Sequence, residues 1–415
     1  MQDNEKKPAL RFKGFTDPWE QRKLGEIAVF SKGVGYSKND LCEEGTPIIL
    51  YGRLYTKYET CIFDVDTFVK EKAGGVYSKG GEVIVPASGE TAEDISIASV
   101  VVKPGILLGG DLNIVSPTAE YDSAFLALTI SSGATHKYLS SLAQGKSVVH
   151  LHNADIQSVS AKFPTKREQE KIHLLFGKID TLITLHQRKY EKLVNIKKSM
   201  LDKMFPKNGA SVPEIRFKGF TDPWEQRKLG DAFERVVRKN TNNESRLPLT
   251  ISAQDGLVDQ ITYFNNRVAS RDVSNYYLVY NGEFAYNKST SDGYPFGAVK
   301  RLDWYEKGVL STLYIVFALK HLEKDDSDFM TVFYDTDRWH RGVAERAAEG
   351  ARNHGLLNIS ADDFFDIDTT MPEDKAEQEK IGRLLKKLDT LITLHQRKLE
   401  KLQNIKKSCL EKMFV

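Results

Sequence analysis

Two stretches of the chain carry apolar residues at alternating steps of three and four. The steps in residues 168–205 fall on Ile172, Leu175, Ile179, Leu182, His186, Lys189, Leu193, Ile196 and Met200, and those in residues 377–414 fall on Ile381, Leu384, Leu388, Leu391, His395, Lys398, Leu402, Ile405 and Cys409. This spacing is typical of a coiled-coil seam, which needs a partner helix to bury it. The pattern therefore predicts two long helices that pack antiparallel against each other about a pseudo-two-fold axis.

The start of each predicted helix carries a capping signal. Thr165 with Glu168, and Asp374 with Glu377, have the spacing of a capping box. We expect the helix pair, or a partner protein, to contact the apolar seam and the two histidines within it. These interface candidates are Ile172, Ile179, Leu182, His186, Leu193, Ile381, Leu388, Leu391, His395 and Leu402. The two histidines are interpreted as register-setting residues, or as a point where the seam opens to a partner.

The chain repeats itself around these helices. Residues 11–25 and 216–230 both read RFKGFTDPWEQRKLG, and residues 168–205 and 377–414 match at 29 of 38 positions. The stretches between them, 26–163 and 231–372, barely resemble each other. A constant scaffold around two different inserts indicates two different recognition modules on one architecture. Trp19 and Trp224 recur in the constant part, so we expect them to be buried anchors.

The inserts mix strand-like runs with helical stretches, which predicts an α/β fold for each. Two weak echoes indicate that they share it. Residues 81–88 align with 282–289 as a strand running into a polar tip, and a loop with glycine and basic residues precedes each long helix. The predicted order is a recognition domain (1–163), a helix (164–206), a second recognition domain (207–372) and a second helix (373–415).

The composition is that of a globular protein, with 40% hydrophobic and 28% charged residues. The net charge of +2 is small, so any binding of a polyanion must rest on local patches. No apolar run approaches the ~20 residues of a membrane span, and the N-terminus lacks the apolar segment of a secretory signal. Three scattered cysteines favour free thiols in a reducing cytoplasm.

DNA bases are read by Arg, Lys, Asn, Gln and Ser side chains on loops, together with aromatic and histidine neighbours. In the first insert the candidates are Lys32, Tyr36, Arg53, Tyr55, Ser88, Lys146, His150 and His152. In the second insert they are Gln254, Asn287, Lys288, Ser289, Tyr294, Arg352, Asn353 and His354. Any one of them taken alone is more often an ordinary surface residue, so only the group carries weight.

Motifs for catalysis are missing from the sequence. It contains no GxGxxG, GxxxxGK[ST] or HExxH, and no spaced nucleophile and base stand out. Neither a metal site nor a cofactor site is expected in this chain. The sequence therefore predicts a non-catalytic binding protein.

The doubled FKGFTDPWEQRKLG segment, the Gly-Glu…Ser strand ends and the EQEKI entries into long helices resemble the specificity subunits of type I restriction–modification systems. The resemblance covers essentially the whole chain. It implies two target recognition domains that read the halves of a split, asymmetric DNA site, with the paired helices setting the gap. It also implies two methyltransferase subunits and restriction subunits as partners, in a prokaryotic cytoplasm. S-adenosylmethionine, ATP and Mg²⁺ would belong to those partners.

Two other functions stay open at this point. One is a coiled-coil assembly scaffold without base specificity, and the other is a single-chain methyltransferase or nuclease, against which the missing motifs argue.

Overall fold

The computed structural model describes residues 7–207, 209–252, 255–347 and 355–414. The chain divides into two compact units, the first made of residues 1–188 and 396–415 and the second of residues 189–395. Each unit therefore holds part of both long helices. The four-part division of the chain that the sequence predicts stays a prediction.

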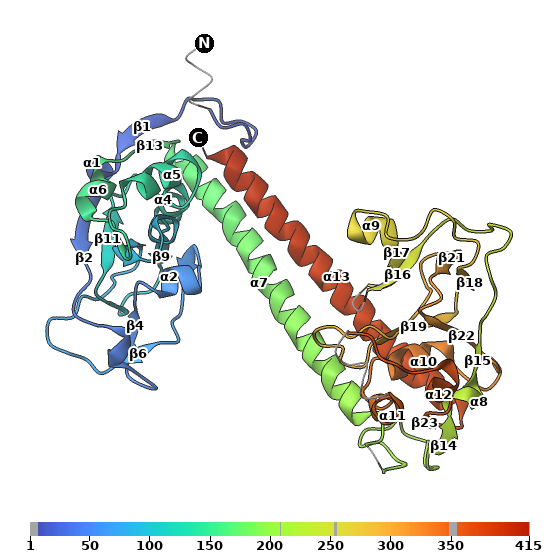
Figure 1. Cartoon of the computed structure of the whole chain (residues 1–415). Helices are drawn as coiled ribbons and strands as arrows, with labels where there is room; N and C mark the ends of the chain where they lie inside the picture. Colours follow the sequence, from blue (N-terminus) through green and yellow to red (C-terminus); the bar gives the residue numbers. More distant parts are fainter. Residues whose placement is uncertain (1–6, 208, 253–254, 348–354, 415) are drawn as a thin grey trace. The chain divides into compact units, whose positions relative to one another are not determined.

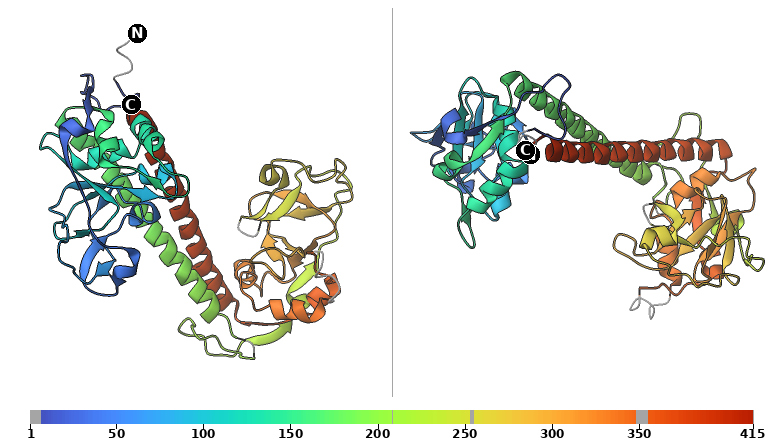
Figure 2. Two further views of the ribbon diagram at one scale, coloured as in Figure 1. Left: turned by 60° about the vertical axis from the view of Figure 1, so that its left-hand side comes forward. Right: turned by 90° about the horizontal axis from the view of Figure 1, so that it is seen from above.

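Each unit is built on an antiparallel sheet with one strand order (Figure 1). In the first unit the order is β2 (Ala28–Lys32), β11 (Leu112–Pro117), β7 (Glu82–Pro86) and β9 (Ser99–Val101), with β5 (Cys61–Ile62) parallel at the edge. In the second unit it is β15 (Phe233–Arg235), β22 (Ile315–Leu319), β19 (Phe284–Asn287) and β20 (Ala298–Arg301). The two dissimilar inserts thus share a mixed α/β architecture, as the sequence predicts. Figure 2 shows the sheets from two further sides.

Short helices cover the sheets. In the first unit these are α3 (Ala92–Ile95), α4 (Ser123–Ile130), α5 (Gly133–Leu142) and α6 (Asn153–Ser158). In the second unit they are α10 (Ser327–Phe333), α11 (His340–Arg346) and α12 (Ala361–Phe365). Residues 124–130 of α4 are all buried, so this helix forms the centre of the first core.

The units differ most in what is inserted between the first and the central strand of the sheet. Residues 33–81 of the first unit form β3 (Leu41–Cys42), β4 (Thr46–Ile49), α2 (Arg53–Thr56), β5 and β6 (Phe68–Val69), with a 3₁₀ turn at Lys38–Asp40, and β10 (Leu107–Leu108) pairs with β4. Residues 236–283 of the second unit form β16 (Leu249–Ser252), β17 (Gly256–Asp259), α9 (Gln260–Phe264) and β18 (Tyr277–Tyr280), which pairs with β21 (Lys307–Leu310). Structural divergence between the units is therefore concentrated in one topological position.

The repeated RFKGFTDPWEQRKLG segment supplies a strand and a turn of helix to each unit. Its strands β1 (Glu20–Lys23) and β14 (Glu225–Lys228) pair antiparallel with β13 (Ser160–Phe163) and β23 (Asp368–Met371), the strands that lead into the long helices. The helical turns α1 (Leu24–Ile27) and α8 (Leu229–Ala232) follow. The repeat is thereby joined to the base of each long helix.

The two long helices are α7 (Lys166–Lys203) and α13 (Lys375–Met413), which confirms the helices that the sequence predicts. They run antiparallel within each unit. In the first unit Lys406 Nζ lies 2.6 Å from Asp180 Oδ1, and in the second Lys197 Nζ lies 2.6 Å from Asp389 Oδ1. These are equivalent pairs in the repeat, so the same ion pair sets the helix register in both units.

The buried seam differs from the predicted one at four positions. Leu182 and Ile405 are 43% and 40% exposed, and Lys189 and Lys398 are exposed as well. The observed steps, all buried or half-buried, fall on residues 172, 176, 179, 183, 186, 190, 193, 197 and 200, and on 381, 385, 388, 392, 395, 399, 402, 406, 409 and 413. Adjacent apolar residues, such as Leu182 beside Ile183, allow both registers, so the sequence alone could not choose between them.

The predicted capping boxes are also corrected. The carboxylates of Glu168 and Glu377 accept both guanidinium N–H groups of Arg11 and Arg216, at 2.7 to 2.8 Å. The first residue of the repeated segment is thus tied to the first turn of each long helix. Asp374 still caps α13, because its side chain accepts the amide of Ala376 at 2.8 Å.

An aromatic cluster of matching composition closes each core. In the first unit Phe414, next to the end of α13, stacks on Phe125 with ring centroids 5.5 Å apart, and Trp19 packs edge-on to Phe125. In the second unit Phe205, just beyond the end of α7, stacks on Phe329 at 5.6 Å, and Trp224 packs edge-on to both. The tryptophans are 3% exposed, which confirms that they are buried anchors.

Arg11→Ala should lower the free energy of unfolding by about 3–5 kcal/mol, because it leaves the fully buried Glu168 carboxylate without its partner. Arg216→Ala should do the same through Glu377. The control is Arg341→Ala, which removes an exposed pair with Glu345 and should cost less than about 0.5 kcal/mol. Urea denaturation measures the free energy of unfolding of all three variants. Losses below about 1 kcal/mol for Arg11→Ala and Arg216→Ala would show that the repeated ion pairs do not stabilise the fold of each unit.

The first unit contains an ion pair that the second lacks. His173 Nδ1 lies 2.9 Å from Asp122 Oδ1, and this partner raises the pKa of His173. The repeat places Gly382 at the equivalent position, where an added Cβ would meet the Phe329 amide nitrogen at 2.6 Å.

A raised histidine pKa stabilises the fold below the unfolded value of ~6.5, and this stability is lost as the pH rises through the folded pKa. The free energy of unfolding should therefore fall by up to about 1 kcal/mol more in the parent than in His173→Gln between pH 6 and pH 8. Urea denaturation at both pH values measures the difference. Equal pH dependence in the two proteins would show that the pair contributes nothing.

Candidate nucleic-acid interface

In each unit the chain that leaves the central strand joins the loop that precedes the last short helix. In the first unit β8 (Ser88–Gly89) pairs antiparallel with β12 (Val149–His150), with His150 opposite Ser88. In the second unit Ser289 forms a bridge with Leu356, and the amide of Leu357 donates to the carbonyl of Lys288 at 3.0 Å. The two segments that the sequence echoes single out are therefore neighbours in the first unit, and in the second unit the described residues 355–357 lie beside residues 288–290.

In the first unit hydrogen bonds fix this loop against three strands. The Leu151 amide donates to the carbonyl of Ala87 at 3.0 Å, Asn113 Nδ2 donates to the carbonyl of Leu151 at 2.8 Å, and Asn153 Nδ2 donates to the carbonyl of Ser31 at 2.9 Å. The polar tip is consequently held on rigid elements, which is how a recognition surface keeps its shape.

Five candidates of the first insert surround this loop. Lys32 is exposed at the end of β2, and His150 and His152 are exposed with nearly parallel rings 6.4 Å apart. Ser88 is only 4% exposed. Lys146 is exposed in the turn between Gln144 and His150, which exchange two backbone hydrogen bonds.

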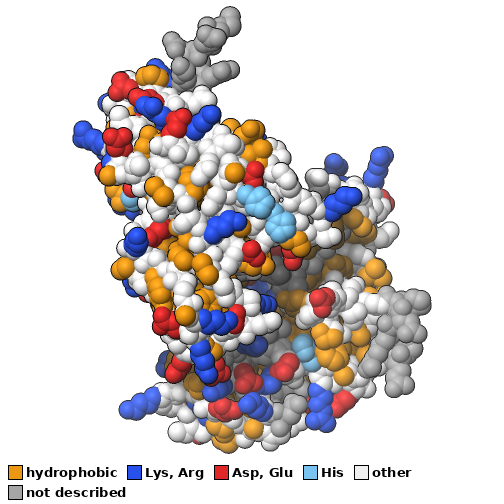
Figure 3. All heavy atoms as spheres, turned by 90° about the vertical axis from the view of Figure 1, so that its left-hand side faces the viewer, with side chains coloured by type: hydrophobic (Ala, Val, Ile, Leu, Met, Phe, Trp, Pro, Cys, Tyr) orange, Lys and Arg blue, Asp and Glu red, His pale blue; other side chains and the backbone are white. Residues whose placement is uncertain are grey.

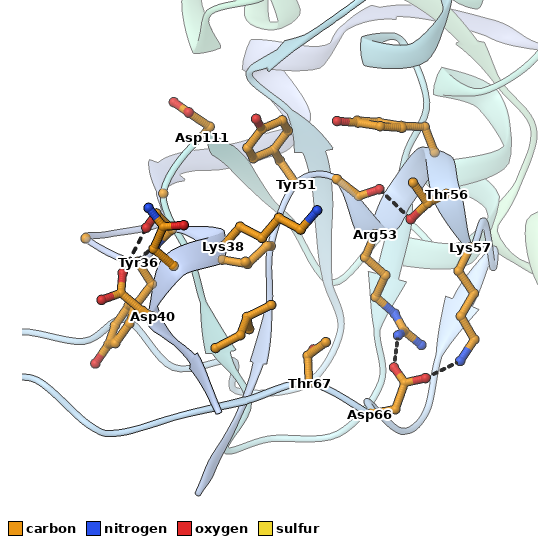
Figure 4. A pocket seen from close by; sticks show the side chains of 18 residues that line it. Tyr36, Lys38, Asp40, Tyr51, Arg53, Thr56, Lys57, Asp66, Thr67 and Asp111 are labelled. Carbon is orange, nitrogen blue, oxygen red and sulfur yellow. Dashed lines mark hydrogen bonds and ion pairs between the residues drawn. The ribbon is translucent and has the colours of Figure 1, made fainter. Parts of the chain in front are cut away.

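The other three candidates of the first insert line a separate pocket in the 33–81 insertion, a cavity of about 840 Å³ (Figure 4). Tyr36 is 6% exposed, and its hydroxyl accepts the amide of Lys72 at 2.7 Å. The Arg53 guanidinium, 8% exposed, is held by Asp66 at 2.6 Å and Glu59 at 2.8 Å. Tyr36 and Arg53 are thus held in the wall of the pocket by hydrogen bonds and ion pairs. Tyr55, the third candidate, is half-buried and is not held by a hydrogen bond of this kind within the described part of the chain.

In the second insert the described candidates lie at the end of β19 and in the turn that follows. The side-chain oxygen of Asn287 accepts the amide of Ser289 at 3.0 Å, and Lys288 Nζ donates to the carbonyl of Ile359 at 3.3 Å. Ser289 is exposed, and Tyr294 is half-buried in a turn closed onto Ser291. The remaining candidates, Gln254, Arg352, Asn353 and His354, lie outside the described residues.

Sequence reasoning missed the residues that complete the pocket of the first unit. Lys38, Asn39, Tyr51 and Asp111 line it beside the three predicted residues. No spacing rule connects Asp111 with the others, because Asp111 lies directly before β11, far from them along the chain. The exposed aromatic pair Tyr263 and Phe264 on α9 was missed as well, although three neighbouring apolar residues in a polar loop are a visible signal.

The face shown in Figure 3 mixes lysine and arginine with acidic side chains and apolar patches. This matches the small net charge of the chain. Among the residues that the structure describes, no three His, Cys, Asp or Glu side chains are grouped so as to hold a metal ion. In the same described part of the chain, no helix is both long and apolar enough to span a membrane.

Comparison with known proteins gives the family. Residues 16–195 match the family model described as the type I restriction modification DNA specificity domain. Residues 16–195 therefore belong to the type I restriction–modification specificity family. The fold of the S subunit of the type I restriction–modification system from M. genitalium covers 99% of both chains at 15% identity, with a TM-score of 0.63. The HsdS subunit from Thermoanaerobacter tengcongensis covers 95% of this chain and 96% of its own at 13% identity, with a TM-score of 0.44. No curated protein sequence matches the chain.

The match to the specificity family begins within the first repeated segment and covers the first insert and most of α7. The second unit repeats those bounding segments and the same sheet order. Membership therefore makes the chain a DNA sequence-specificity subunit.

Proposed function

We propose that this specificity subunit reads a bipartite, asymmetric DNA site, one half with each unit, and positions methyltransferase and restriction subunits on it. The observation that carries the proposal is the strand order that four strands of each sheet share, together with the unlike insertions. A common scaffold gives both units the same mode of docking to DNA. Different insertions, 33–81 and 236–283, give them different sequences to read.

The charge distribution supports recognition through small local surfaces. Phosphate contacts position a protein on DNA, and base-edge contacts specify the sequence. The first unit exposes side chains that can donate hydrogen bonds to phosphates or to base edges, namely Lys32, Lys146, His150 and His152. A net charge of +2 leaves little general attraction for DNA, so the partner subunits are expected to add to the affinity.

The outer faces of the long helices support docking of two copies of one partner. Residues 180–189 and 389–398 are identical, and each exposes leucine: Leu182 and Leu185 are 43% and 44% exposed in the first unit, and Leu394 is 44% exposed in the second. Exposed apolar residues of this kind mark protein interfaces. The proposed occupants are two methyltransferase subunits, with restriction subunits joining the assembly.

The proposed chemistry belongs to these partners. Adenine methylation with S-adenosylmethionine, and cleavage that uses ATP and Mg²⁺, would take place on the methyltransferase and restriction subunits. An adenine must leave the base stack to be methylated, so the methyltransferase, not this chain, would hold the target base. The proposed setting is the cytoplasm of a prokaryote. The alternative of a scaffold without base specificity predicts DNA binding that is independent of sequence.

Mapping methylated bases across the genome of cells that express this chain with its methyltransferase tests the proposal. The expected result is a split motif with a methylated adenine in each half. Exchange of residues 33–81 for the same insertion of another family member should change one half-site, and exchange of residues 236–283 should change the other. A motif in which both halves change together, or the lack of any motif, would contradict the assignment of one half-site to each unit.

A further inference from the structure

The pocket in the 33–81 insertion has the chemistry of a nucleotide site. We call it the insertion groove, and its lining comes from residues 35–41, 50–57, 66–67 and 110–111 of the first unit. The cavity of about 840 Å³ lies in the range of small-molecule sites, about 300–1,000 Å³. We propose that the insertion groove binds a single nucleotide whose base is unstacked from its neighbours.

The groove offers a flat ligand an aromatic surface. Tyr51 and Tyr55 are half-buried, and their ring centroids are 6.2 Å apart at an angle of 56°. The buried Tyr36 forms part of the opposite wall, and the hydrogen bond from the Lys72 amide fixes its hydroxyl. Bases stack on aromatic side chains regardless of their identity, because every base has a π-face. In a duplex that face is covered by the neighbouring bases, so only an unstacked nucleotide can use these tyrosines.

Two of the three acidic groups that line the groove are already neutralised within the protein. Lys72 pairs with Asp40, and the hydrogen bond from Lys72 lowers the pKa of the Asp40 carboxyl to about 2. Asp66 is paired with Lys57 at 2.7 Å and with Arg53 at 2.6 Å, and these hydrogen bonds lower its pKa to about 2. These carboxylates keep their charge at neutral pH, and each has a cationic partner beside it.

Lys38 is the basic side chain of the groove that is available to bind a ligand. It is exposed, lines the groove between Tyr36 and Arg53, and has no ion-pair partner among the described residues (Figure 4). An ammonium group in this place fits a phosphate. Exposed Asn39 and Asp111 also line the groove and offer an amide and a carboxylate to the edge of a base. Asp111 is held in a left-handed backbone conformation with φ of 58° at the start of β11.

Together these groups match the parts of a nucleotide: aromatic rings for the base face, polar groups for the base edge and an ammonium for the phosphate. The second unit has β16, β17 and α9 in the equivalent insertion, which is built differently, so the proposal concerns the first unit. That the nucleotide is part of the recognised DNA rests on the proposed function, whereas binding of a free nucleotide does not.

The test is a titration of the purified chain with each of the four deoxynucleoside 5′-monophosphates, followed by saturation-transfer NMR on the base protons. Saturable binding is expected, with 2-deoxyribose 5-phosphate and inorganic phosphate at least about tenfold weaker because they lack the stacking surface. Lys38→Glu and Tyr55→Ala should each weaken binding by at least about fivefold. Tyr55→Phe, which keeps the ring, should bind like the parent.

Lys137→Glu is the matched control, because it reverses an exposed lysine on α5 outside the groove and should leave binding unchanged. Equal melting temperatures of the variants would show that loss of binding is not loss of the fold. Equal affinity for the phosphates without a base, or parental affinity in Lys38→Glu and Tyr55→Ala, would overturn the inference. A split methylation motif without nucleotide binding overturns only this inference, and nucleotide binding without a motif overturns only the proposed function.

Discussion

Both units depend on one constraint: the C-terminal end of a long helix completes the hydrophobic core of each unit. Phe414 follows α13 and stacks on Phe125 in the first unit, and Phe205 follows α7 and stacks on Phe329 in the second. Each α/β unit is thus finished by the helix that begins in the other. Two ion pairs set the register of the helices, one between Lys406 and Asp180 and the other between Lys197 and Asp389. This register places each phenylalanine ring against its aromatic partner.

The constant parts of the chain serve this closure, which leaves the inserts free to differ. Arg11 and Arg216 bind the repeated segments to the first turns of the helices, and the segments pair as strands with the residues just before those helices. No described residue of the 33–81 or 236–283 insertions takes part in these contacts. The first insertion meets the scaffold elsewhere, because β5 joins the sheet and Thr60 Oγ1 donates to Asp180 Oδ2 at 3.3 Å. A specificity subunit needs this separation, since recognition has to vary while assembly stays fixed.

Local and periodic features of the fold could be predicted from the sequence, whereas partners brought together by folding could not. The long helices, the strands that run into the polar tips (β7 and β19) and the buried tryptophans follow from periodicity and repetition. The predicted seam was wrong at four positions because apolar residues stand side by side, as at Leu182 and Ile183. The bidentate pair of Arg11 with Glu168 spans 157 positions, and no spacing rule reaches so far. For the same reason Arg53 looked available for DNA although Asp66 and Glu59 hold it.

Amide hydrogen exchange on the full chain tests the crossed closure of the cores most directly. Phe414→Ala should speed exchange of the α4 amides in the first unit and leave α10 at the parental rate, because Phe125 loses its stacking partner. Phe205→Ala should do the reverse through Phe329. Loss of protection confined in this way to one unit is the predicted result. Equal loss in both units with either variant, or no loss with either, would contradict the account.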